Sequence, residues 1–334
     1  MTLVACIGGG QLGRMLGLAG LPLGLDFRFL DPAPDACARA VGELVVAEYG
    51  DPEGLERLAV GSDVITYEFE NVPVEAAGGV GALPGVVALE HGQDRLREKQ
   101  LFRSLGIPTA RFGSLEETGV PAIVKTRRLG YDGKGQRRVA APEQLADGEL
   151  AEEVVAFERE LSIIGVRGRD GDTRFWPVGE NLHRDGILRV TRAPAPNAPQ
   201  HEAEAICAAL LDALDYVGVL AVELFEVDSG VLANEFAPRV HNTGHWTIDG
   251  APTSQFENHV RAILGLPLGA TTPAAPCVMV NLVGRLPSLA ELTALPGARV
   301  HLYGKEPRPG RKVGHVTLVD PDEATVERAI ALAG

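Results

Sequence analysis

The stretch from residue 218 to residue 246 reads GVLAVELFEVDSGVLANEFAPRVHNTGHW. Residues 219–227 and 231–236 form two apolar runs rich in β-branched side chains, and the Asp-Ser-Gly sequence at 228–230 between them has turn chemistry. This pattern predicts two antiparallel strands joined by a tight turn. We expect the rest of the chain to be arranged around this hairpin.

The predicted hairpin carries one acid on each strand, Glu223 on the first and Glu235 on the second. Pairing across the turn can bring both carboxylates to one place, and carboxylates in an apolar run need a cation between them. Oxygen ligands of this kind suit Mg²⁺ bound against phosphates. A single strand acid is more often exposed and solvated, but Asn234, Arg239 and His241 lie near this pair, and Arg and His can bind developing negative charge. The stretch therefore predicts a metal-nucleotide site with Glu223 and Glu235 as metal ligands.

Length, composition and charge limit the class of protein. The chain has 334 residues, of which 45% are hydrophobic, so it can bury a full core and is expected to form two or three domains. Its formal net charge of -14 argues against a nucleic-acid partner or an anionic membrane surface, because both need a basic face. The 4 cysteines lack metal-finger spacing, and we see no basic leader or membrane-length apolar run, so we expect buried free thiols in a cytoplasmic protein.

Residues 1–95 alternate short apolar runs with helical segments, which predicts a Rossmann-like domain with a parallel sheet. A strand at residues 3–7 leads into GGGQLG at 8–13, which contains a G-x-G-x-x-G pattern, and a second strand ends at Asp31. Alone, this pattern suggests a nicotinamide-binding fold, although the same turn offers backbone N–H groups to any phosphate. Glu68 follows a later strand at its carboxyl end, where parallel sheets bind ligands.

A charged helical segment begins near Gln93 and is stopped by Gly106. Most such helices present a solvated face, and we expect Arg97, Glu98 and Lys99 to lie on it.

The next segment has the chemistry of a phosphate-binding loop. A strand ends at Lys125 and is followed by GYDGKGQ at residues 130–136, where small residues let the backbone approach a phosphate and cations offset its charge. The Walker pattern is absent, and the alternative is a glycine-rich hairpin tip without a ligand. A further strand is predicted at residues 152–157, and another begins near Glu160.

At this point the sequence resembles a known family. Lys125, the GYDGKGQ loop, the segment from 152 to 160 and the pair Glu223 and Glu235 form the pattern of the ATP-grasp superfamily. Within it, the chain is similar to the 5-(carboxyamino)imidazole ribonucleotide synthases. The motifs that carry this similarity are GGGQLGRM at 8–15, YEFE at 67–70, QDRLREK at 93–99, ENLHRDGIL at 180–188, NEFAPRVHNTGHWT at 234–247, SQFENHVRAILGLPLG at 254–269 and RPGRKVGH at 308–315. One departure is Thr243, where the family usually has serine, and the hydroxyl is kept.

The resemblance implies an ATP-dependent carboxylation in de novo purine synthesis. Bicarbonate is phosphorylated to carboxyphosphate, and the amine of 5-aminoimidazole ribonucleotide receives the carboxyl group, with release of ADP and phosphate. Such phosphoryl transfer depends on metal ions and fixed cations, so ATP and Mg²⁺ are the expected cofactors. The family also suggests a homodimer.

The resemblance further implies site residues. Arg239 and His241, with Asp132 and Lys134 of the loop, are the expected catalytic residues. The expected ATP-binding residues are Arg95, Lys125, Gly130, Tyr131, Asp132, Gly133, Lys134, Gly135, Gln136, Glu152, Glu153, Val154, Val155, Glu160, His183, Asn234 and Glu235.

The ribonucleotide is expected to bind to residues from three parts of the chain. They are Gln11, Leu12, Glu68, Tyr131, Asp132, Lys134, Lys305, Arg311 and Lys312, of which the last two and Lys305 would hold its 5′-phosphate. His241 has a second interpretation, as a structural hydrogen-bonding residue at the end of a strand.

Two other functions remain open at this stage. A related ATP-grasp enzyme that formylates glycinamide ribonucleotide with formate would share the ATP site, but the YDGKGQ and HNTGHW segments argue against it. A nicotinamide-dependent dehydrogenase would explain only residues 8–31. The expected architecture is an α/β ATP-grasp fold with an N-terminal Rossmann-like domain at 1–95, a small lid subdomain at 96–158 and a larger C-terminal domain at 159–334.

Overall fold

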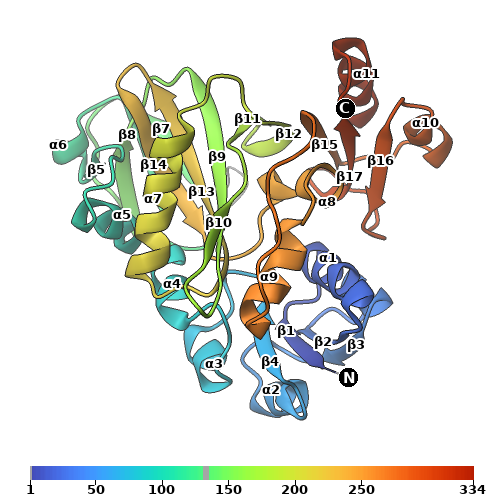
Figure 1. The fold of residues 1–334 in the computed structure, drawn as a ribbon. Helices are drawn as coiled ribbons and strands as arrows, with labels where there is room; N and C mark the ends of the chain where they lie inside the picture. The colour runs from blue at the N-terminus through green and yellow to red at the C-terminus, as the bar shows by residue number, and fades with distance from the viewer. Residues whose placement is uncertain (1, 131–134) are drawn as a thin grey trace.

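The computed structural model describes residues 2–130 and 135–334, and these residues form three β-sheets (Figure 1). The N-terminal sheet is parallel and has the strand order β3-β2-β1-β4. Its strands are β1 (Leu3–Ile7), β2 (Asp26–Asp31), β3 (Glu43–Val46) and β4 (Val64–Tyr67). The predicted parallel α/β organisation of this region is confirmed.

Helices cover both faces of the N-terminal sheet. Leu16 of the first helix shares one core cluster with Phe29, whereas Leu58 of the second shares another with Leu30. The second helix is capped by Asp51, whose carboxylate accepts the N–H of Gly54 (3.0 Å). The helices of this region are α1 (Gln11–Gly20), α2 (Pro52–Ala59), α3 (Val74–Gly79) and α4 (Val86–Gly92), with 3₁₀ turns η1 (Leu21–Leu23) and η2 (Cys37–Ala40).

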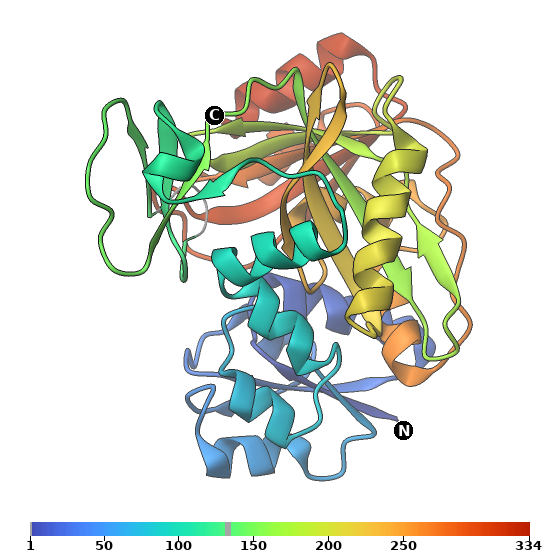
Figure 2. The ribbon, with the colours of Figure 1, turned by 90° about the vertical axis from the view of Figure 1, so that its left-hand side faces the viewer.

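A small antiparallel sheet projects to one side of the molecule (Figure 2). Its order is β5-β8-β6-β7, with strands β5 (Phe112–Gly113), β6 (Ala122–Thr126), β7 (Gln136–Val139) and β8 (Glu149–Glu153), accompanied by α5 (Arg95–Ser104) and α6 (Leu115–Thr118). The prediction of a strand at 152–157 was wrong in its bounds, because the observed strand is β8 (Glu149–Glu153). Pairing of β8 with β6 stops at Glu153 opposite Ala122, because Pro121 before it has no N–H to donate.

The third sheet is antiparallel and nine-stranded, with the order β14-β13-β9-β11-β12-β15-β17-β16 and β10 paired to β9. Helix α7 packs on one face with residues such as Leu220 and Val222, and α9 packs on the other with Val219 and Ala221. This alternation follows from the period of two in a strand. The strands are β9 (Arg159–Arg167), β10 (Thr173–Phe175), β11 (Gly179–Arg184), β12 (Ile187–Ala193), β13 (Gly218–Val227), β14 (Gly230–Ala237), β15 (Cys277–Val283), β16 (Ala298–Leu302) and β17 (Lys312–Val319). The helices are α7 (Gln200–Ala213), α8 (Thr247–Gly250), α9 (Gln255–Leu264), α10 (Leu289–Thr293) and α11 (Glu323–Ala333), with η3 (Asn242–Gly244).

The predicted hairpin is confirmed as β13 and β14. Glu223 lies directly opposite Glu235, and a bulge follows between Glu223 and Leu224. Strand β14 is at the edge of its sheet, where the segment around Thr109 forms a bridge to Ala233. The segment that leads into the small sheet therefore lies against the open edge of the hairpin.

The structure bears on two expectations from composition, the state of the cysteines and the presence of membrane-spanning helices. Cys6, Cys37, Cys207 and Cys277 are buried and free, as expected. Across residues 2–130 and 135–334, no helix is both long and apolar enough to span a membrane.

Candidate active site

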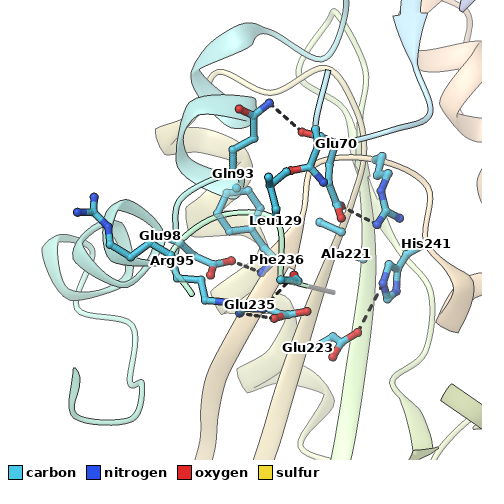
Figure 3. A pocket seen from close by; sticks show the side chains of 16 residues that line it. Glu70, Gln93, Arg95, Glu98, Leu129, Ala221, Glu223, Glu235, Phe236 and His241 are labelled. Atoms are coloured by element: carbon cyan, nitrogen blue, oxygen red, sulfur yellow. Dashed lines mark hydrogen bonds and ion pairs between the residues drawn. The ribbon is translucent and has the colours of Figure 1, made fainter. Parts of the chain in front are cut away.

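A polar pocket opens where the β13–β14 hairpin, the start of α5 and the segment after β4 meet. Its walls include Glu70, Arg95, Glu223, Glu235 and His241. Figure 3 shows the two hairpin acids side by side, with Arg95 reaching Glu235 and His241 turned toward Glu223. Both carboxylates of the predicted pair therefore face one cavity.

The two hairpin acids differ in their ionisation. Burial and the charge of Glu235 raise the pKa of Glu223 to about 7. Burial alone would also raise the pKa of Glu235, but the charges of Arg95 and Lys125 lower it to about 2. Two carboxylates so close together resist simultaneous ionisation unless a cation is shared between them.

The residues around the acid pair suit a hard divalent cation. Asn234 precedes Glu235, and its side-chain oxygen Oδ1 is buried with no hydrogen-bond partner in this structure. The described part of the chain has no cluster of three or more His, Cys, Asp or Glu side chains arranged for a metal. Two carboxylates and an amide oxygen leave coordination positions for phosphate oxygens and water, as Mg²⁺ prefers.

Arg95 connects the acid pair to the start of the glycine-rich loop. Its Nη1 donates to Glu235 Oε2 (2.7 Å) and its Nη2 donates to the carbonyl of Gly130 (3.3 Å). Tyr131, Asp132, Gly133 and Lys134, which carried catalytic and ligand predictions, lie outside the described residues. Of the rest of the loop, Gly135 has φ +71° and accepts the N–H of Thr126 (2.7 Å), and Gln136 begins β7.

The small sheet contributes a second cation to this region. Lys125 Nζ donates to Glu152 Oε2 (2.9 Å), and this carboxylate is buried on β8. Glu153, the next residue, faces the other way and pairs with Arg111 (2.7 Å). Val154 is exposed and Val155 half-buried beyond the end of the strand. Of the four consecutive residues 152–155 that were expected to bind ATP, only Glu152 has its side chain on Lys125.

The expectation for the charged helix was partly wrong. Arg97 is exposed, as expected, but Glu98 and Lys99 are 2% and 0% exposed and face the hairpin. Lys99 Nζ donates to the carbonyl of Asn234 (2.6 Å), and Glu98 Oε1 accepts the N–H of Phe236 (2.7 Å). In a short helix of mostly charged residues, the sequence alone does not show which side will pack against another element. The burial of Glu98 and Lys99 therefore had no signal in the sequence.

Glu160 and His183 form a third polar pair on neighbouring strands. His183 Nδ1 contacts Glu160 Oε2, and both line a hollow of about 300 Å³ beside Phe157. Burial alone would lower the pKa of His183, but the hydrogen bond that it donates to Glu160 and the charges of Glu223 and Glu160 raise it. The structure thus joins two residues that the resemblance assigned to the nucleotide.

The end of the hairpin places Arg239 and His241 at the same pocket. Arg239 Nη2 pairs with Glu70 Oε2 (2.6 Å), a residue the sequence analysis did not single out. His241 Nε2 lies 3.5 Å from Glu223 Oε1, and Nδ1 accepts the N–H of Thr243 (3.5 Å). Burial and the nearby charge of Arg239 lower the pKa of His241 well below its usual value, which favours the neutral imidazole.

A second cluster lies at the N-terminal sheet. Glu68 is buried and accepts N–H groups from Gly10 (2.9 Å) and Gly13 (3.2 Å), and Lys305 Nζ bonds to the side chain of Gln11. Burial raises the pKa of Glu68. The side chain of Leu12, by contrast, is in the apolar core, which leaves only its backbone for a ligand.

Arg311 precedes β17 and Lys312 begins it, and the charges of these two residues change the pKa values of different groups. The charge of Arg311 lowers the pKa of Lys305, after the larger effect of burial, whereas the charge of Lys312 acts on Glu223 and His241. Arg311 therefore lies near Lys305, whereas Lys312 lies near the acid pair.

Comparison with known proteins covers almost the whole chain. Residues 1–88 match the ribonucleotide synthetase preATP-grasp domain, residues 100–256 the ATP-grasp domain, and residues 277–329 the phosphoribosylaminoimidazole carboxylase C-terminal domain. The chain is 49% identical over 350 residues to the N5-carboxyaminoimidazole ribonucleotide synthase of Pseudomonas aeruginosa, covering 98% of this chain and 97% of that protein.

Solved structures agree with this relationship. The N5-carboxyaminoimidazole ribonucleotide synthetase of Thermus thermophilus matches with 50% identity and a TM-score of 0.91, covering 98% of this chain and 96% of that one. The synthase of Aspergillus clavatus in complex with ADP and 5-aminoimidazole ribonucleotide matches with 29% identity and a TM-score of 0.90, covering 99% and 98%. A dehydrogenase would leave most of this similarity unexplained. The chain belongs to the N5-carboxyaminoimidazole ribonucleotide synthase family of ATP-grasp ligases.

Proposed function

We propose that this protein uses ATP to carboxylate 5-aminoimidazole ribonucleotide with bicarbonate, giving N5-carboxyaminoimidazole ribonucleotide, ADP and phosphate in purine biosynthesis. The observation that carries the proposal is the pocket in which Glu223 faces Glu235 while Arg95 and His241 contact the pair. Family membership supports it, and so does the Aspergillus clavatus relative, which binds ADP and 5-aminoimidazole ribonucleotide.

The chemistry has two steps. A bicarbonate oxygen attacks the γ-phosphorus of ATP, the bond to the bridging oxygen breaks, and ADP leaves with formation of carboxyphosphate. The amine nitrogen of the ribonucleotide then attacks the carboxyl carbon, phosphate leaves, and the amine loses a proton. Lys125 and Arg95 are cations positioned to stabilise the phosphate oxygens in the first step.

Mg²⁺ would be held by Glu223 and Glu235, with the unpartnered Oδ1 of Asn234 beside them. When bound, the ion offsets the charge that develops on the transferred phosphoryl group. Arg95 would then exchange its bond to Glu235 for the nucleotide phosphates.

Arg239 and His241 would hold bicarbonate and carboxyphosphate. His241 Nδ1 contacts Thr243 Oγ1 (3.0 Å), and Nε2 faces Glu223; with its proton on Nε2, neutral His241 would donate to a carboxylate oxygen of the bound anion. Lys312 acts on the same end of the pocket by charge. Asp132 and Lys134 keep their proposed catalytic roles.

Glu68 and Gln11 would bind the ribonucleotide at the first turn of α1, with Lys305 and Arg311 at its 5′-phosphate. The boundaries 1–95, 96–158 and 159–334, a homodimeric assembly and a cytoplasmic location are further parts of the proposal.

The test is ADP release from Mg-ATP in the presence of bicarbonate labelled with heavy oxygen. We expect release to depend on 5-aminoimidazole ribonucleotide and the label to appear in phosphate. Ribonucleotide-dependent release without label in phosphate would contradict bicarbonate phosphorylation. No stimulation by the ribonucleotide would contradict the substrate assignment.

A further inference from the structure

The backbone on both sides of Glu235 is held by two consecutive residues of α5. Strand β14 is an edge strand, so one side of its backbone points away from the nine-stranded sheet. On that side Glu98 Oε1 accepts the N–H of Phe236 (2.7 Å), and Lys99 Nζ donates to the carbonyl of Asn234 (2.6 Å). The residues that immediately precede and follow Glu235 are therefore both bound by side chains from one helix.

Lys99 also connects this strand to the small sheet. Its Nζ donates to Thr109 Oγ1 (3.0 Å), and Thr109 Oγ1 donates to the carbonyl of Ala233 (2.7 Å). The same Nζ lies 3.5 Å from Glu152 Oε2, which accepts a hydrogen bond from Lys125 Nζ (2.9 Å). A continuous series of polar contacts thus runs from Asn234 to Lys125.

We infer that Glu98 and Lys99 are positioning residues. They hold the β14 backbone so that the Glu235 carboxylate stays opposite Glu223 and at a constant position relative to Lys125 of the small sheet. The inference rests on the proposed function, because it assigns these residues a role toward the proposed metal-nucleotide site. Glu98 lines the pocket, but its Oε1 and the Nζ of Lys99 are engaged by the β14 backbone. Their effect is on geometry, and a misplacement of about 1 Å at a reacting group can cost on the order of a hundredfold in rate.

Glu98→Met and Lys99→Met remove the hydrogen bonds while keeping side-chain length, and Glu98→Gln keeps an acceptor for Phe236. Arg97→Met is the matched control, because Arg97 lies on the same helix with its side chain 49% exposed. The measurement is ADP affinity by calorimetry with and without Mg²⁺, together with the thermal unfolding temperature. A purely structural role would change both affinities equally, whereas loss of positioning changes the ratio between them.

We expect the two methionine variants to weaken Mg-ADP binding about tenfold and metal-free ADP binding by less than about twofold, since a buried hydrogen bond that holds the β14 backbone is lost in each. Glu98→Gln and Arg97→Met should stay within about twofold of the unmodified protein in both conditions. An unchanged ratio in folded methionine variants would overturn the inference, as would an equal effect of Arg97→Met.

Two further measurements distinguish failure of this inference from misfolding of a variant and from failure of the proposed metal site. If a methionine variant fails to fold, Thr109→Val tests the same strand through the Ala233 carbonyl, and its Mg-ADP affinity should fall about threefold more than its metal-free affinity. An unchanged ratio there also overturns the inference. If the unmodified protein binds ADP equally with and without Mg²⁺, the proposed metal site itself fails.

Discussion

Replacing Glu235 by glutamine should abolish turnover while the fold is retained. The substitution keeps the size of the side chain and removes its charge. Glu235 has no other role in the core, and its side chain is 38% exposed. Its ion pair with Arg95 is therefore screened by solvent, and its loss should cost only about 1 kcal/mol of folding free energy.

The effect on catalysis should be much larger. Glu235 is one of two carboxylates proposed to hold Mg²⁺, and its charge balances Arg95 and Lys125. Removal of a single preorganised electrostatic group at a reacting centre costs about 10²–10³-fold in kcat, or about 2.7–4 kcal/mol. We expect a loss at the upper end of this range or beyond, because the glutamine amide is a poorer metal ligand.

The assay is ribonucleotide-dependent ADP release at saturating Mg-ATP, with thermal unfolding measured in parallel. An unfolding temperature within a few degrees of the unmodified protein, combined with the loss of turnover, is the expected result. Near-normal turnover would show that Glu235 is not an essential metal ligand. A large drop in unfolding temperature would refute the conclusion that its ion pair with Arg95 is weak.

Three further predictions concern other parts of the molecule. Lys305→Met should raise the KM for 5-aminoimidazole ribonucleotide about tenfold or more with little change in the KM for ATP, because the charged contact proposed for the 5′-phosphate is lost; an equal rise in both would contradict its assignment. His259 is buried between Thr66 (2.9 Å) and the N–H of Val219 (3.1 Å), and burial lowers its pKa to about 4. Since the unfolded state then binds more protons between about pH 6.5 and pH 4, stability should fall by about 3 kcal/mol as the pH is lowered through this window, and His259→Gln should flatten that dependence in urea unfolding measurements. Mg-ATP at about 100 times its Kd should stabilise the protein by about 2.7 kcal/mol in thermal unfolding, whereas NAD should not; protection by NAD would reopen the dehydrogenase interpretation.

The main motifs could be located from the sequence because they are local in the chain. The hairpin acids, the strand ending at Lys125 and the glycines at 8–13 are each defined by a few neighbouring residues whose spacing sets the structure. Family resemblance then assigned roles to residues such as His183 and Lys305, which no local pattern marks.

Errors arose where a side chain's environment is made by a distant segment. Glu98 and Lys99 resemble ordinary surface residues of a charged helix, yet they are buried against β14, more than one hundred and thirty residues away. The end of β8 was misplaced for a similar reason, because it depends on where its partner strand begins. Glu70, which pairs with Arg239, gave no signal that separated it from a solvated acid.

The sequence by itself determined the parallel α/β organisation of the N-terminal region, the position of the acid-bearing hairpin and the family, because periodicity, turn chemistry and motif spacing are properties of adjacent residues. Only the tertiary structure decided which charges are buried, that the pKa of His241 is lowered, and that the charge of Lys312 acts on the acid pair while that of Arg311 acts on Lys305. The physical reason is that burial and electrostatic interaction depend on distances between atoms, and folding brings together side chains that the chain keeps far apart.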